Sequence, residues 1–172
     1  MKQESHPFVV FVAALLGLFT VPVFAEQPTV IRAGSLFDSQ SGQVTRNAVI
    51  VIEGEKIVAV GGPSTPVPDD ANIIDLSNSF VLPGVMDMHT HIVGNLDNYF
   101  FAGYFQSPHR ATIGGVVNAE KTLLGGFTTI RNVGAGDYAD IAIRNAINAG
   151  EIPGPRMAVS GPGLGITGGH CD

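Results

Sequence analysis

Strand-like and helix-like segments alternate along the second half of this sequence. Strands are predicted at 85–91, 127–133 and 156–160, and the first of them is a short, largely apolar run. The segments between them, at 112–124 and 138–149, repeat apolar side chains at helical spacing and are predicted helices. Gly125 and Gly150 directly follow the two helical segments, where glycine commonly ends a helix. A strand–helix–strand–helix–strand order is typical of parallel strands covered by helices. The alternation therefore predicts an α/β fold.

The preceding part of the chain carries strand patterns only. Runs rich in β-branched residues predict strands at 29–33, 48–52, 56–60, 72–76 and 80–82. Two of these runs flank a short loop that contains Gly54, which is the pattern of a β-hairpin. Residues 26–82 are therefore predicted to form a β region, either a free-standing module or part of a larger one.

The first strand of the α/β half carries an unusual set of polar side chains. Pro83–Gly84 predicts a turn, and Asp87, His89 and His91 then follow at every second position. Because side chains alternate across a strand, these three are predicted to point to one side. Polar groups on one face of a buried strand are costly without partners, and two imidazoles can converge on one divalent metal ion. Asp87 is predicted to orient a ligand or to be an extra one. The alternative is a pair of ordinary strand histidines bonded to backbone.

Composition narrows the classes of partner. The formal net charge of −6 argues against nucleic acid, which requires a basic face. A single cysteine, Cys171, excludes an internal disulfide framework. Neither observation bears on the oligomeric state, which stays open.

The first 25 residues resemble a secretory signal peptide. Lys2 precedes an apolar run at residues 8–19, and Val23 and Ala25 are small residues at a cleavage point. The apolar run is short for a membrane span of about 20 residues, so cleavage is favoured over an uncleaved anchor. We therefore expect a secreted or periplasmic protein with no stable membrane anchor after cleavage.

The motifs together resemble those of the amidohydrolase superfamily of metal-dependent hydrolases. The stretch from Pro83 to His91 resembles its first-strand signature, and Gly125–Gly134 resembles its second barrel strand. Residues 153–156, 160–161 and 166–170 look like its third strand and the following loop. The combination is most similar to the imidazolonepropionase-like or Xaa-Pro dipeptidase-like branch.

This resemblance implies a specific architecture and site. Residues 26–82 would be the amino-terminal part of a small β-sandwich, and residues 83–172 the first three strands of a partial (β/α)8 TIM barrel. His89 and His91 would bind the metal, which the resemblance implies to be one or two zinc ions, with Asp87 supporting them. We expect His170, which follows the third strand, to contact substrate, although a loop histidine without a role is the alternative. The general base expected from the family lies on a later strand, so no catalytic base is assigned here.

The resulting functional hypothesis is an amino-terminal fragment of a secreted amidohydrolase. The resemblance implies a small-molecule or dipeptide substrate, in which the enzyme would hydrolyse a C–N amide or peptide bond of a dipeptide or cyclic amide. The 172-residue chain alone would be inactive or nearly so. Two alternatives stay open, namely a non-catalytic metal- or peptide-binding module and a mononuclear deaminase of the same superfamily. Three further expectations concern other residues. Residues 93–110 form a loop that includes His109 as an ordinary loop histidine, and Arg131 and Arg156 make salt bridges or clamp a substrate carboxylate.

Overall fold

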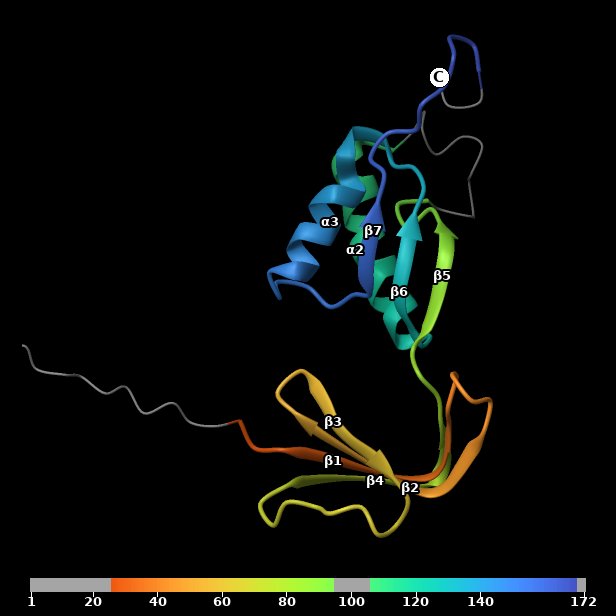
Figure 1. The fold of residues 1–172 in the computed structure, drawn as a ribbon. Coiled ribbons are helices and arrows are strands. Elements are labelled where there is room, and N and C mark those ends of the chain that lie inside the picture. Colours follow the sequence, from red (N-terminus) through yellow and green to blue (C-terminus); the bar gives the residue numbers. More distant parts are fainter. Residues whose placement is uncertain (1–25, 95–105, 170–172) are drawn as a thin grey trace, which may run out of the picture. The chain divides into compact units, whose positions relative to one another are not determined.

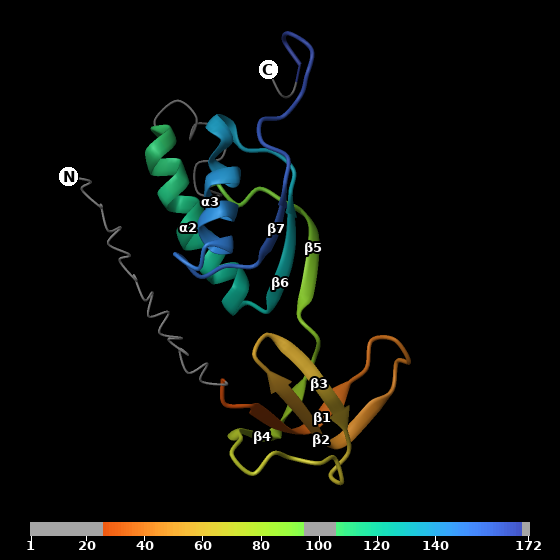
Figure 2. The ribbon, with the colours of Figure 1, turned by 60° about the vertical axis from the view of Figure 1, so that its left-hand side comes forward.

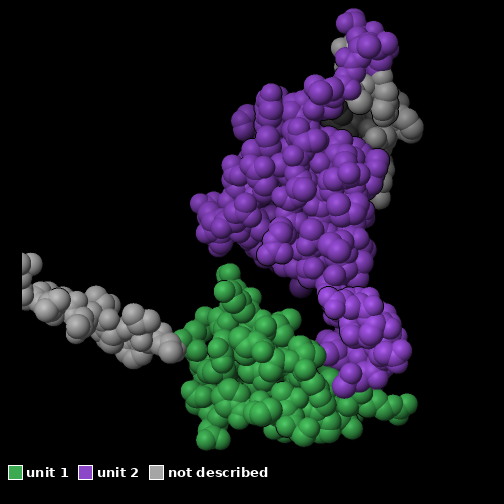
Figure 3. Space-filling view, in the orientation of Figure 1, with its two compact units in different colours: residues 1–34, 46–79 green, residues 35–45, 80–172 purple. Residues whose placement is uncertain are grey.

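A computed structural model describes residues 26–94 and 106–169 of the chain. The predicted signal peptide at residues 1–25, His170 and Cys171 lie outside these described residues. The chain divides into two compact units, residues 1–34 with 46–79 and residues 35–45 with 80–172 (Figure 3). The domain limits predicted from the sequence stay a prediction.

The first sheet has four strands in the order β3-β2-β1-β4. They are β1 (Thr29–Phe37), β2 (Val44–Glu53), β3 (Lys56–Gly61) and β4 (Asn72–Val81). The predicted hairpin is confirmed, because β2 and β3 pair antiparallel around Gly54, which has a φ of +56°. Val30, Val49 and Val51 form the buried core of this sheet.

Strand β4 corrects one sequence prediction. Two short strands were expected at 72–76 and 80–82, but a single strand runs through the polar residues between them. Most of β4 is exposed, so its polar side chains lose little hydration. The carboxylate Oδ1 of Asp75 also accepts a hydrogen bond from the backbone N–H of Ser77 at 2.9 Å. Polar residues therefore continue the strand instead of ending it.

The second sheet confirms the α/β prediction. Its strands are β5 (Val85–Thr90), β6 (Phe127–Asn132) and β7 (Arg156–Val159), in the order β5-β6-β7, and both pairings are parallel. The helices α2 (Pro108–Leu124) and α3 (Ala139–Asn148) connect them and lie on one face of the sheet (Figures 1 and 2). A short 3₁₀ turn, η2 (Gly136–Tyr138), precedes α3. The carboxyl ends of all three strands consequently meet at one edge.

Helix α2 begins four residues earlier than the sequence pattern predicts. The side chain of Ser107 caps it by accepting the N–H of Arg110 at 3.3 Å, and Pro108 occupies the first turn. His109 therefore lies in the first turn of a helix, not in the predicted loop, and its side chain is exposed. The predicted helix end is confirmed, with Gly125 at the C-cap and Gly126 at a φ of +92°.

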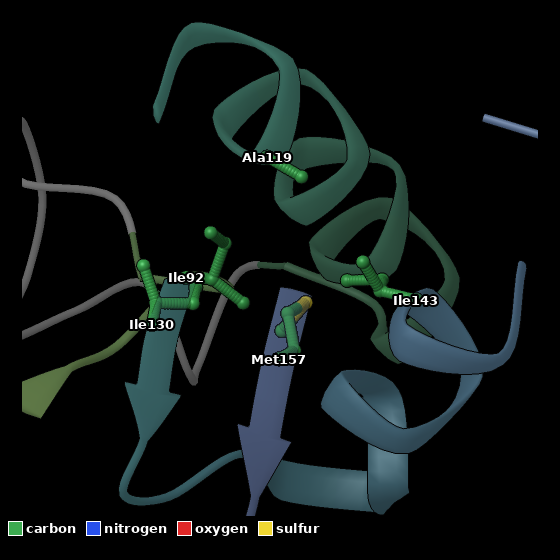
Figure 4. Packing of buried hydrophobic residues seen from close by; sticks show 5 residues of the cluster. All are labelled: Ile92, Ala119, Ile130, Ile143 and Met157. Carbon is green, nitrogen blue, oxygen red and sulfur yellow. The ribbon is translucent and has the colours of Figure 1, made fainter. Parts of the chain in front are cut away.

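The core of the second sheet lies between the strands and the two helices. Its buried members are Ile92, Ala119, Ile130, Ile143 and Met157 (Figure 4). They come from the segment after β5, from α2, β6, α3 and β7, so each element contributes one side chain. Among the described residues, no helix is both long and apolar enough to cross a membrane.

The first prediction concerns this core. Ile130 is fully buried, so Ile130→Ala is expected to lower the free energy of unfolding by about 2–5 kcal/mol through lost burial and the cavity that remains. Ile113 on α2 is 58% exposed and provides the control. Ile113→Ala should change the free energy of unfolding by less than about 0.5 kcal/mol. Urea denaturation of both variants measures the difference. Equal losses would show that Ile130 is not a core residue.

The second prediction uses two neighbouring glycines of α2. A Cβ added at Gly114 meets no atom within 4 Å, whereas one at Gly115 would lie 2.5 Å from Cδ1 of Ile143, a side chain that is 1% exposed. Gly114→Ala is expected to stabilise the chain by about 0.5–1 kcal/mol through helix propensity. Gly115→Ala has the same propensity gain but must displace Ile143, so the chain should be less stable than with Gly114→Ala. Thermal denaturation compares the two, and equal stabilisation would contradict the close contact between α2 and α3.

Candidate metal centre

His89 and His91 stand together at the carboxyl end of β5. Their ring centroids are 5.5 Å apart with an interplanar angle of 65°, and both side chains are exposed. A zinc–nitrogen bond of about 2 Å places a bound ion about 3 Å from each ring centre, so two rings that share one ion stand about 5 Å apart. The chemistry and the spacing of these two donors therefore fit a divalent metal ion.

The strand that carries the histidines is irregular at this point. Asp87 pairs with Ile130 and Thr90 with Asn132, so the register shifts between Asp87 and Thr90. Strict alternation along β5, on which the sequence prediction relied, is therefore interrupted beside His89. Bulge-like irregularities of this kind re-aim side chains and are frequent near active sites.

The carboxylate of Asp87 contacts the backbone next to it. Its Oδ1 accepts a hydrogen bond from the N–H of His89 at 3.0 Å, and the side chain is half-buried. This bond constrains the backbone that carries the His89 ring. The sequence left two roles open for Asp87, orienting a ligand or being an extra ligand. This geometry suits the orienting role, which stays a prediction.

Arg131, a residue of β6, is hydrogen-bonded to the backbone beside the two histidines. The Nε of Arg131 donates to the carbonyl of Met88 at 2.6 Å, and the hydroxyl of Thr90 donates to the carbonyl of Arg131 at 3.2 Å. The N–H of Val133 donates to the carbonyl of Thr90 at 3.0 Å. Arg131 thus bonds to the backbone of β5, a role that neither the predicted salt bridge nor the predicted substrate clamp describes.

The ring of His91 lies against the loop that follows β6. Its Nδ1 is 3.4 Å from the carbonyl oxygen of Gly134, and a Cβ at Gly134 would lie 3.7 Å from Cε1 of the ring. A carbonyl oxygen only accepts, so this contact is a hydrogen bond when the proton is on Nδ1. Nε2 then keeps the lone pair that a metal ion needs.

A buried polar pair lies behind this edge, and sequence reasoning missed it. Asn132 at the end of β6 and Asp140 in the first turn of α3 are both 0% exposed. The Nδ2 of Asn132 donates to Oδ2 of Asp140 at 3.0 Å, and its Oδ1 accepts the N–H of Ile92 at 2.7 Å. Oδ2 of Asp140 also accepts the N–H of Gly161, beyond β7, at 3.2 Å. An asparagine at the end of a predicted strand was the available signal, but its partner on the next helix could not be read from spacing.

The described residues bring together two of the predicted site residues, not a complete ligand set. Across residues 26–94 and 106–169, no group of three or more His, Cys, Asp or Glu side chains could hold a metal ion. His170, the predicted substrate contact, is not among the described residues.

Comparison with known proteins adds independent information. The sequence profile of the Amidohydrolase family matches residues 80–171. Ochratoxinase from Aspergillus niger is 34% identical over 149 residues, which are 84% of this chain and 30% of that protein. Imidazolonepropionase from Fusobacterium nucleatum is 42% identical over 65 residues, 33% of this chain and 15% of that protein.

A solved structure agrees in fold as well as in sequence. The crystal structure of a Xaa-Pro dipeptidase with bound methionine in the active site matches with a TM-score of 0.75 and 35% identity, covering 85% of this chain and 36% of that one. The chain therefore spans about a third of the length of ochratoxinase and of this dipeptidase. Because the family profile covers more than half of the chain, including the strand that carries His89 and His91, this protein belongs to the Amidohydrolase family.

Proposed function

We propose that this chain carries the first-strand metal ligands of a hydrolase that cleaves a C–N amide or peptide bond in a small substrate. The observation that carries the proposal is the pair of exposed imidazoles, 5.5 Å apart, within the part of the chain that matches the family. The names of the relatives support hydrolysis, and a dipeptidase with methionine in its active site supports a small, amino-acid-like ligand. Dipeptides and cyclic amides are the proposed substrate class.

The proposed roles follow from the donors present. His89 and His91 would hold one divalent ion through ring nitrogens, and zinc is the proposed metal. Asp87 would keep the backbone of His89 in place through the bond to its N–H. A metal bound there would polarise the substrate carbonyl and lower the pKa of a water molecule towards about 7.

The proposed barrel accounts for the location of this site. Three parallel strands with helices on one face are one part of the arrangement that a (β/α)8 barrel repeats, and such barrels place their chemistry at the carboxyl ends of the strands. His89 and His91 lie at that end of β5. We also propose that the protein is secreted or periplasmic, on the basis of the pattern in residues 1–25.

The third prediction tests the metal site. Titration of the 172-residue chain with Zn²⁺ should show binding, and His89→Gln or His91→Gln should weaken it by about 100-fold or more, because each removes a ligand. His109→Gln is the matched control, since this histidine is exposed in the first turn of α2. Binding that is equally strong in all three variants would rule out the proposed ligands.

The fourth prediction tests the reaction. Catalytic zinc normally has three protein ligands, so the 172-residue chain with added Zn²⁺ or Mn²⁺ should not turn over dipeptides. A longer protein that contains this sequence should release free amino acids from them, and His89→Gln with His91→Gln should abolish that release. Mass spectrometry of the products measures both.

Three other outcomes of the turnover experiment would each support a different conclusion. Rapid turnover by the 172-residue chain would contradict the incomplete ligand set. Release of ammonia instead of amino acids by the longer protein would favour a deaminase, and metal binding without any turnover would favour a binding module.

A further inference from the structure

We propose that Asn132 and Asp140 are positioning residues that hold the ring of His91 in the Nδ1–H tautomer, with the Gly134 carbonyl as the link between them. This inference deepens the proposed function and rests on it, because the tautomer matters where Nε2 of His91 binds a metal. Neither residue touches the imidazole directly in the hydrogen bonds described above.

The first step is the carbonyl of Gly134. It accepts a hydrogen bond from Nδ2 of Asn132 at 3.2 Å and lies 3.4 Å from Nδ1 of His91, which can donate to it only when that nitrogen carries the proton. An exposed imidazole has few other constraints, and the hydrogen bond of one ring nitrogen decides which nitrogen carries the proton. The position of this carbonyl therefore controls the tautomer of His91.

The second step is the orientation of the Asn132 amide. Its oxygen faces the N–H of Ile92 at 2.7 Å, and its nitrogen faces a carboxylate oxygen of Asp140 at 3.0 Å. Rotating the amide by 180° would place its nitrogen, a donor, against the N–H of Ile92 and its oxygen, an acceptor, against the carboxylate of Asp140. Because Asn132 is fully buried, water could not compensate either contact. The amide therefore has one orientation, in which its N–H groups point to Gly134 and to Asp140.

The third step is the anchoring of Asp140. Its Oδ2 accepts the N–H of Gly161 at 3.2 Å in addition to the Asn132 amide, and its Oδ1 accepts the N–H of Ile141 at 2.9 Å. Three donors compensate a buried carboxylate and connect α3 with the segment after β7. Asp140 is thus fixed independently of His91, and its position is transmitted through Asn132.

A second amide provides a matched comparison. The Nδ2 of Asn118 on α2 donates to the carbonyls of Ile92 at 2.8 Å and Gly94 at 3.1 Å. It holds the backbone that follows His91 but makes none of the bonds to the Gly134 carbonyl described here. Removing Asn118 should loosen that backbone and leave the tautomer of His91 unchanged.

The experiment measures the tautomer directly in the metal-free chain. Long-range ¹H–¹⁵N NMR of the ¹⁵N-labelled 172-residue chain, at a pH where imidazole is neutral, distinguishes Nδ1–H from Nε2–H, and the signal of His91 is assigned by its loss in His91→Gln. We expect Nδ1–H in the wild-type chain and in Asn118→Ala. Asp140→Ala and Asn132→Ala should each give a mixture of the two tautomers. Asp140→Asn should keep Nδ1–H, because its amide oxygen can still accept from Asn132 and Gly161, although its amide nitrogen cannot replace the Oδ1 that accepts the N–H of Ile141.

Zn²⁺ titration of the same variants separates this inference from the proposed function. Asp140→Ala and Asn132→Ala should weaken binding by about 10–100-fold, as is usual for groups that orient a ligand. An Nε2–H tautomer in the wild-type chain would overturn the inference even where a variant fails to fold, and so would an unchanged tautomer in both folded alanine variants. If the tautomers change as expected but His91→Gln binds Zn²⁺ as tightly as the wild-type chain, the positioning is supported and the metal site is refuted.

Discussion

The hydrogen bonds of one buried amide connect the segments on which the candidate site depends. Asn132 accepts the N–H of Ile92, which directly follows the histidine segment, and donates to the carboxylate of Asp140 on α3. A buried amide has a high cost when any of its partners is missing, so each of these bonds favours the presence of the other. The ends of β5 and β6 and the start of α3 are consequently held in one arrangement.

That arrangement explains how an exposed pair of side chains can be well placed. The rings of His89 and His91 lie at the surface, so packing in a hydrophobic core does not hold them in place. The backbone beside them, in contrast, is bonded to the β6 segment, because the carbonyl of Met88 accepts from Arg131 and the carbonyl of Thr90 accepts the N–H of Val133. Rigid neighbours therefore position the proposed ligands, which is the condition for binding a metal with defined geometry.

Much of the fold could be predicted because the relevant signals are local. Apolar periodicity identified the two helices, the short segments before, between and after them identified β5, β6 and β7, and the glycines at 54 and 125 identified a hairpin turn and a helix end. The early start of α2 depends on the Ser107 cap, which lies outside the apolar pattern. The continuity of β4 depends on its exposure, which the sequence alone does not show. The histidine pair was visible as a motif, whereas Asn132 and Asp140 meet only when a helix folds back beside the strand end, so their partnership was missed.

The central claim is that the imidazoles of His89 and His91 share one metal ion. X-ray absorption spectroscopy of the 172-residue chain with one equivalent of Zn²⁺ tests it most directly, because imidazole rings give a characteristic scattering pattern beyond the first shell. We expect two imidazole nitrogens at about 2.0 Å from the zinc ion, with oxygen atoms completing the coordination. A zinc ion surrounded by oxygen atoms alone, without imidazole scattering, would contradict it. So would imidazole scattering that remains in the variant with both His89→Gln and His91→Gln.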